Sequence, residues 1–127
     1  MDKIYLFDLA SRHAAWASVR QSAIAGNIAN ADSPGYRAVE VEPFSAVLNK
    51  THLTEAQTNP RHLSMSASGV ETMKMKDEDS WSVSEDGNTV SLDQQMVKAA
   101  EVGGAYTLNT SIVRSFHRMV LASVRTA

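Results

Sequence analysis

Two long stretches near the ends of the chain carry apolar or small side chains at alternating spacings of three and four residues. In the first, from about residue 5 to 30, the repeat has one polar member, Gln21, and consists of Phe7, Ala10, Ala14, Ala17, Gln21, Ile24, Ile28 and Ala31. This is the spacing of a heptad seam, and it predicts a helix that packs against another helix. Because several seam positions are alanine, each contact buries little area, and we expect the helix to need neighbours.

The first helix is expected to end near Asn30. The segment Asp32-Ser33-Pro34-Gly35-Tyr36 follows directly. A residue before proline is disfavoured in a helix, and the pair Pro-Gly favours a turn.

The second stretch predicts another long helix, beginning near Leu92. Its start is marked by Ser91 and Gln94, which have the spacing of a capping box. The seam that follows comprises Leu92, Met96, Ala99, Gly103, Tyr106, Thr110, Val113, His117, Val120 and Val124. The apolar stripe is widened by Ile112, Phe116 and Met119, which indicates more than one neighbouring helix.

The segment between the two stretches, about residues 37–91, is polar and acidic. It has a possible helical turn at 44–48 and a turn at 85–88, and polar-apolar alternation at 62–66 and 81–84 predicts two short strands that pair as a small hairpin. Residues 74–79 between them are expected to form a mobile tip. The predicted fold is therefore mainly α: two long terminal helices form a coiled-coil-like antiparallel pair, joined by a long polar middle with a possible small β-hairpin. We divide the chain into an N-terminal helix and turn (1–36), a middle segment (37–90) and a C-terminal helix (91–127).

Composition narrows the classes of function. With 127 residues the chain is long enough for one domain, and aromatics at 6% leave little material for a thick core. Residues 38–93 hold ten acidic and four basic side chains, whereas the basic residues at the two ends are scattered, so a nucleic-acid-binding face is not expected. There is no cysteine, no stretch long enough to span a membrane and no pattern of a cleaved signal peptide.

Catalytic and cofactor motifs are not found either. The four histidines, His13, His52, His62 and His117, lack the spacing of a zinc site. The chain has no nucleophile elbow, no phosphate-binding glycine loop and no dinucleotide fingerprint. We therefore expect no enzyme activity, no cofactor and no bound metal. His13 and His117, on or beside the seams, are expected to be packing or interface residues.

The end of the first helix closely resembles the amino-terminal signature of the flagellar basal-body rod proteins, a family of rod and hook axial proteins. The match comprises Asn27, Ile28, Ala29, Asn30, Ser33, Pro34, Gly35 and Tyr36, with Ser33 in place of the usual threonine. A second segment, from Gly87 to Met96, resembles the start of the C-terminal helix in one proximal rod protein of this family. Together with Ala100, Tyr106 and Phe116, these matches cover about half the chain.

The resemblance implies a structural subunit of the proximal rod, the drive shaft in the periplasm, exported by the flagellar type III apparatus without a cleaved signal peptide. It implies as partners copies of the chain itself, the rod proteins FlgC, FlgF and FlgG, the adaptor FliE and the MS ring. Two alternatives remain: another axial rod protein of the FlgC type, or a soluble helical hairpin, a secretion substrate or chaperone, that binds a partner helix.

We expect the function to be mechanical, with the terminal helices interlocking between subunits and transmitting torque. The signature residues would fix the exit of the chain from the first helix, because a buried asparagine can bridge backbone groups and Gly35 can adopt a positive φ. The residues expected to form the assembly seams are Phe7, Ala10, Ala14, Ala17, Ile24, Leu92, Met96, Ala99, Tyr106, Val113, Phe116 and Val120.

Overall fold

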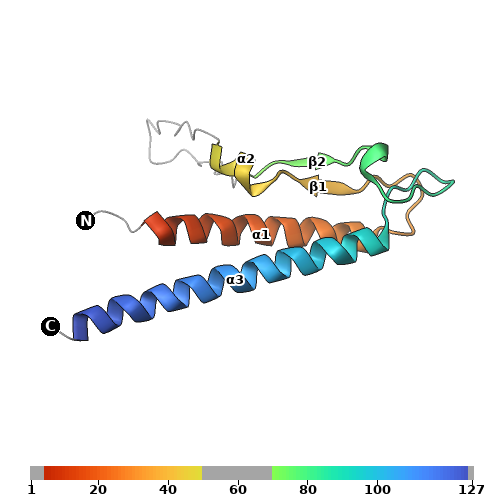
Figure 1. The fold of residues 1–127 in the computed structure, drawn as a ribbon. Coiled ribbons are helices and arrows are strands. Elements are labelled where there is room, and N and C mark those ends of the chain that lie inside the picture. The colour runs from red at the N-terminus through yellow and green to blue at the C-terminus, as the bar shows by residue number, and fades with distance from the viewer. Residues whose placement is uncertain (1–4, 50–69, 126–127) are drawn as a thin grey trace, which may run out of the picture.

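The computed structural model describes residues 5–49 and 70–125. Along the chain its elements are α1 (Tyr5–Ala29), β1 (Val39–Val41), α2 (Phe44–Asn49), β2 (Thr72–Lys74), the 3-10 turn η1 (Asp77–Asp79) and α3 (Leu92–Arg125). Helix α1 lies in the middle, with α3 on one side and the two strands and α2 on the other (Figure 1). The mainly helical fold with two long terminal helices is thereby confirmed; the three segment boundaries stay predictions.

Helices α1 and α3 run antiparallel, as their contacts show. The side-chain amide of Asn27, near the end of α1, lies 3.1 Å from Gln95 at the start of α3. At the other end of α1, the rings of Phe7 and Phe116 meet edge to face with centroids 5.7 Å apart. With 25 and 34 residues the helices are about 37 and 51 Å long. The last turns of α3 therefore extend past the beginning of α1 (Figure 1).

The main core lies where α1 meets the other layers. It contains Trp16, Ala17 and Ile24 of α1, together with Val41, Val47 and Val102. Trp16 is only 6% exposed, and its Nε1–H donates a hydrogen bond to the main-chain oxygen of Glu42 at 2.8 Å. The core is thin, as the low aromatic content predicts, because α3 contributes only Val102 as a fully buried apolar residue.

The middle segment contains a small antiparallel sheet, as predicted, but its strands are elsewhere in the sequence. Strand β1 pairs with β2 in the register Val39 with Lys74 and Val41 with Thr72. The predicted strand at 81–84 is wrong: this segment leads into a turn closed by Ser84 N–H donating to the oxygen of Asn88 at 2.9 Å. The other predicted strand, 62–66, lies outside the described residues.

Residues 74–79, predicted as a mobile tip between the strands, instead contain the end of β2 and the turn η1. Met75 in this segment is buried in a second small core with Ala38 and Val90. The adjoining turn is tied to the chain after α1 by an ion pair between Arg37 and Asp77. One buried side chain and one ion pair therefore attach to the rest of the molecule a segment that its polar sequence does not distinguish from a loop.

The local signals for helix ends are confirmed. Helix α1 ends at Ala29, just before the predicted stop, and α2 occupies the predicted turn. Helix α3 begins at Leu92, and Ser91 Oγ accepts a hydrogen bond from Gln94 N–H at 3.5 Å. The reciprocal half of the capping box is replaced by a longer-range contact: Gln94 Nε2 donates to the main-chain oxygen of Asp79 at 2.8 Å.

We expect the substitution Trp16→Phe to lower the free energy of unfolding by about 1–3 kcal/mol, because it leaves the oxygen of Glu42 without its buried donor. The control is Trp81→Phe, at a tryptophan that is 63% exposed and whose ring has no described contact in a core. Thermal unfolding followed by circular dichroism measures both. Equal melting temperatures for the two variants would contradict this account of the core.

Candidate functional site

The signature asparagine Asn27 is 1% exposed and connects all three layers. Its Nδ2 donates to the main-chain oxygen of Val39 at 2.8 Å and to Gln95 Oε1 at 3.1 Å. Its Oδ1 accepts the main-chain N–H of Val39 at 2.8 Å and lies 3.4 Å from the hydroxyl of Tyr36. The amide thus pairs with strand β1 as a neighbouring strand would, which confirms that a buried asparagine here bridges backbone groups.

The other polar signature residues close the end of α1. Asn30 Nδ2 donates to the main-chain oxygen of Gly26 at 2.9 Å, and Ser33 Oγ donates to Asn30 Oδ1 at 3.2 Å. These bonds satisfy groups that a helix end leaves without partners. By contrast, Ile28, Ala29 and Pro34 are exposed and make no part of this network.

Gly35 has a φ of +66°, so it adopts the positive φ on which the predicted effect of a substitution there depends. Its N–H donates to the main-chain oxygen of Asp86 at 3.0 Å. Gly87, with a φ of +81°, lies against it: a Cβ added at Gly87 would stand 3.9 Å from the Cα of Gly35. The turn after α1 and the turn before α3 are therefore packed backbone against backbone, and glycine permits both conformations.

Asn88, which was not among the predicted site residues, caps the end of α1 although it lies more than 50 residues later in the sequence. It is almost completely buried, and its Nδ2 lies 3.0, 2.9 and 2.8 Å from the main-chain oxygens of Asn30, Ala31 and Ser33. Its Oδ1 accepts the N–H of Val90 at 2.8 Å. The available signal was its place in the second segment of family resemblance, directly after a turn glycine.

Two further polar residues complete the junction and were also missed. Thr89 Oγ1 accepts the N–H of Ala38 at 2.9 Å, and its own N–H donates to the oxygen of Tyr36 at 3.0 Å. Gln95 is 0% exposed beside Asn27. No pattern pointed to Gln95, because a glutamine next to an apolar seam ordinarily faces water. We call the residues Asn27, Asn30, Gly35, Tyr36, Asn88, Thr89 and Gln95 the exit junction.

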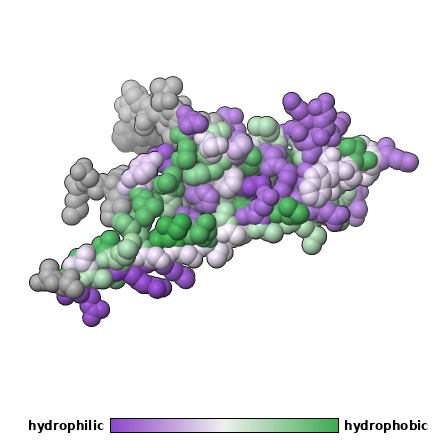
Figure 2. Space-filling view, in the orientation of Figure 1, coloured by the Kyte–Doolittle hydropathy of each residue, from purple (hydrophilic) through white to green (hydrophobic). Residues whose placement is uncertain are grey.

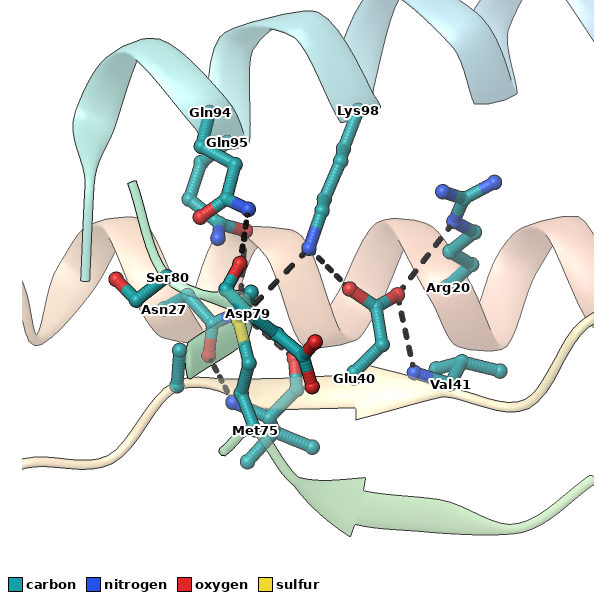
Figure 3. Close-up of polar contacts among 12 residues, drawn as sticks. Arg20, Asn27, Glu40, Val41, Met75, Asp79, Ser80, Gln94, Gln95 and Lys98 are labelled. Atoms are coloured by element: carbon teal, nitrogen blue, oxygen red, sulfur yellow. Dashed lines mark hydrogen bonds and ion pairs between the residues drawn. The ribbon is translucent and has the colours of Figure 1, made fainter. Parts of the chain in front are cut away.

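A chain of charges next to the exit junction links the same three layers. Glu40 of β1 forms an ion pair with Lys98 of α3, and its carboxylate lies 3.9 Å from Arg20 Nε of α1 (Figure 3). Arg20 also reaches Glu101 at 3.4 Å. Because all four side chains retain some contact with water, each pair contributes at most about 1 kcal/mol. The network fixes the relative orientation of the layers more than it stabilises them.

The predicted seam residues have different environments in the single chain. On α1, Ala10, Ala17 and Ile24 are buried, and Phe7 and Ala14 are half-buried. On α3, Ala99, Val113 and Phe116 are half-buried, whereas Leu92, Met96, Tyr106 and Val120 are exposed, Met96 by 67%. The helix is turned so that Gln95, Val102 and Asn109 face α1, and Asn109 Nδ2 donates to the oxygen of Ala10 at 3.0 Å. As contacts between subunits, all of these residues stay predictions.

One of the two seam histidines packs within the single chain. His13 meets the ring of Phe44 edge to face, with centroids 4.8 Å apart. His117 is exposed, although its neighbour Phe116 contacts Phe7 of α1. A role of His117 in an interface with another subunit stays a prediction.

Two grooves flank the contact between α1 and α3. The larger, of about 590 Å³, is lined by Ala14, Ala17, Ser18, Gln21, Ser22, Ala25, Val102, Gly103 and Tyr106. The smaller, of about 250 Å³, is lined mainly by bulky side chains, among them Leu9, Phe44, Leu108 and Ile112. Figure 2 shows hydrophobic side chains gathered along the two helices. We call the first the small-residue groove, because only Gln21, Val102 and Tyr106 of its lining residues are large.

Within residues 5–49 and 70–125, no three histidine or acidic side chains are grouped as metal ligands would be. In the same residues, neither long helix has the run of apolar side chains that crossing a bilayer requires.

We expect Asn88→Asp to unfold the exit junction, because it places a carboxylate oxygen against three main-chain oxygens that now share one donor group. The loss should be about 3 kcal/mol or more, as for an unpaired buried charge. Asn49→Asp, at the exposed end of α2, is the control and should change stability by less than about 0.5 kcal/mol. Urea titration followed by tryptophan fluorescence distinguishes the two variants. Equal urea midpoints for both would contradict the role of Asn88 as a cap of α1.

We also expect Gly35→Val to destabilise the turn and to block rod assembly, because a β-branched residue is strongly disfavoured at a φ of +66°. Gly26→Ala is the matched control: a Cβ at this helical glycine meets nothing within 4 Å, so it should stabilise α1 by about 1 kcal/mol. Motility of cells carrying each variant and thermal unfolding are the readouts. Normal rods in the valine variant would contradict the role of this turn.

Comparison with known proteins identifies the family. No family model matches the chain. The chain is 44% identical over 130 residues to the flagellar basal body rod protein FlgB of Agrobacterium fabrum, with 98% of this chain and 96% of that protein covered. It is 32% identical over 87 residues to FlgB of Buchnera aphidicola, with 64% and 65% covered. The match to FlgB decides against the FlgC-type and soluble-hairpin alternatives. A subunit of the basal body rod assembles with other rod components. From the extent of this match, the chain belongs to the FlgB family of structural, non-enzymatic rod proteins of the flagellar basal body.

Proposed function

We propose that this rod subunit assembles helically through α1 and α3 and transmits torque across the contacts between neighbouring helices. The observation that carries the proposal is the pair of open surfaces on these helices: a groove lined by small side chains and an α3 whose apolar residues are largely uncovered. Contiguous exposed apolar surface of this kind is typical of interaction sites.

The small-residue groove is suited to a helix as its occupant. Ser18, Ser22 and Ala25 line its wall on α1, and Gly103 lines its wall on α3. Short side chains let the backbone of a neighbouring helix approach closely, so that many small contacts add up over the length of the groove. The groove of about 590 Å³ is open to such a neighbour along the middle of the helix pair.

Helix α3 offers the large apolar side chains that could fill such a groove on a neighbouring subunit. Its exposed large apolar residues include two of the predicted seam positions near its start and continue to its end: Leu92, Met96, Val97, Tyr106, Leu108, Ile112, Met119, Val120, Leu121 and Val124. These residues lie on more than one face of α3, as the widened stripe of the sequence predicts. A helix that is apolar on several faces is stable in water only when several neighbours cover it.

The exit junction is suited to transmitting force between α1 and α3. Its hydrogen bonds join the end of α1, strand β1 and the start of α3, and most of its side chains are buried. Buried hydrogen bonds between segments favour a single arrangement, although Gln95 Nε2 has no partner in the network. A twist applied to one helix would therefore be passed to the other at this junction, and onward through the contacts with neighbouring subunits.

The finer set of partners follows from the family resemblance. We propose that the terminal helices contact copies of the chain, the rod proteins FlgC, FlgF and FlgG, the adaptor FliE and the MS ring. The subunit would occupy the periplasmic rod after export through the flagellar type III apparatus. Support from this chain is the set of exposed apolar side chains on α3, which lie on more than one face of the helix.

Ser22→Phe tests the proposal, because it fills the small-residue groove with a ring while leaving the core unchanged. Ser22 is exposed, so stability should shift by less than about 0.5 kcal/mol. Rod assembly, scored by motility and by basal bodies in electron micrographs of cells relying on the variant, should be lost. The control is Ser45→Phe, at an exposed serine of α2 that lines neither groove. Full motility with Ser22→Phe would overturn the proposed use of the groove.

A further inference from the structure

Gln21 is the one polar residue among the seam positions of α1, and it lines the small-residue groove. The other α1 residues that line the groove are alanines and serines, so the glutamine side chain is the longest on that wall. It is exposed, and its amide has no hydrogen bond with any described residue. A polar side chain in an apolar helix seam lowers the strength of helix pairing, and coiled coils use such a residue to fix one register and one partner.

The opposite wall of the groove also carries one polar group. Tyr106 of α3 lines this wall and is 52% exposed, and its hydroxyl has no hydrogen bond with a described residue. Gly103 leaves open space on the same wall, because a Cβ added there would meet nothing within 4 Å. None of the described residues that line the groove is charged. The groove therefore offers a neighbouring helix an uncharged surface with two hydrogen-bonding groups.

A helix that enters the groove removes both polar groups from water. An amide or hydroxyl that loses water without gaining a partner weakens binding by about tenfold or more. A charged side chain against these walls weakens binding further, because no described lining residue carries a compensating charge. The groove therefore favours a helix with an uncharged stripe of small and apolar side chains, interrupted by an amide or a hydroxyl at the level of Gln21.

We propose that Gln21, together with Tyr106, selects the helix that fills the small-residue groove, and that this helix belongs to another rod component. This inference rests on the proposed function and names the chemistry of one of its contacts. The last turns of this chain's own α3 carry Arg118 and Arg125, so they match an uncharged groove poorly. The selected helix pairs its own amide or hydroxyl with Gln21 in one register, and helices without that group are rejected.

Three variants of the full-length chain test the selection. Gln21→Leu keeps the bulk of the side chain and removes its hydrogen-bonding groups, whereas Gln21→Asn keeps the amide. The control is Ser11→Leu, which adds a leucine at an exposed position of α1 that lines neither groove. Because both positions are exposed, the melting temperature of each purified variant should match that of the wild type.

The readouts are rod assembly in cells and self-association of the purified chain. In cells that rely on Gln21→Leu, the number of complete rods in electron micrographs should fall at least about tenfold, whereas Gln21→Asn and Ser11→Leu should support motility. In sedimentation velocity, Gln21→Leu should self-associate at least about tenfold more tightly than the wild type, because its groove no longer rejects mismatched helices. Simple damage to the fold would not strengthen association.

Each outcome decides the proposal. Loss of rods together with stronger self-association of Gln21→Leu supports it, and so do motile revertants that map to a helix of another rod component. Normal rods or unchanged self-association with Gln21→Leu overturns it, as does an equal loss of rods with Gln21→Asn. Revertants confined to this chain also overturn it, and indicate a second copy as the occupant. If Ser22→Phe abolishes rods while Gln21→Leu assembles normally, the helical assembly stands and selection by Gln21 alone falls.

Discussion

The side-chain amide of Asn27 holds the three layers of this fold together. It pairs with both main-chain groups of Val39 and also donates to Gln95, at a position that is 1% exposed. A buried polar group left without its partner costs about 1–3 kcal/mol. With a core this thin, losing two or three such bonds is a large fraction of the stability of the chain. The arrangement of β1 and α3 around α1 therefore depends strongly on this residue, beside the main core and the Glu40–Lys98 ion pair.

The structure separates a rigid end from an open end. The exit junction and the smaller core lie near the end of α1 and the start of α3, and the main core extends from there to Trp16 in the middle of α1. Beyond Val102, α3 has no fully buried residue, and its apolar side chains are largely exposed. The chain thus combines a well-packed junction between its helices with exposed apolar surfaces that neighbouring subunits can cover. A structural rod subunit needs both.

The parts that were predicted correctly are those with local causes. Pro34 and Gly35 end α1, Ser91 starts α3, and the heptad spacing gives two helices of nearly the right lengths. The strands were misplaced because a pairing between Val39 and Lys74 joins residues far apart in the sequence, and alternation at 81–84 carries no information about partners. Rotation of α3 was misjudged for a similar reason: Gln95 is buried by Asn27, a residue of another helix.

The site divides in the same way. Asn27, Asn30 and Gly35 could be found from the sequence, because a family signature and a Pro-Gly turn mark them. Asn88 and Gln95 could not be ranked above other polar residues, since their role exists only where the chain returns to the end of α1. The sequence by itself therefore determined the helices, their ends and the family resemblance, all of which depend on neighbouring residues. Only the tertiary structure decided which polar side chains are buried and which apolar ones stay open, because burial depends on contacts between distant segments.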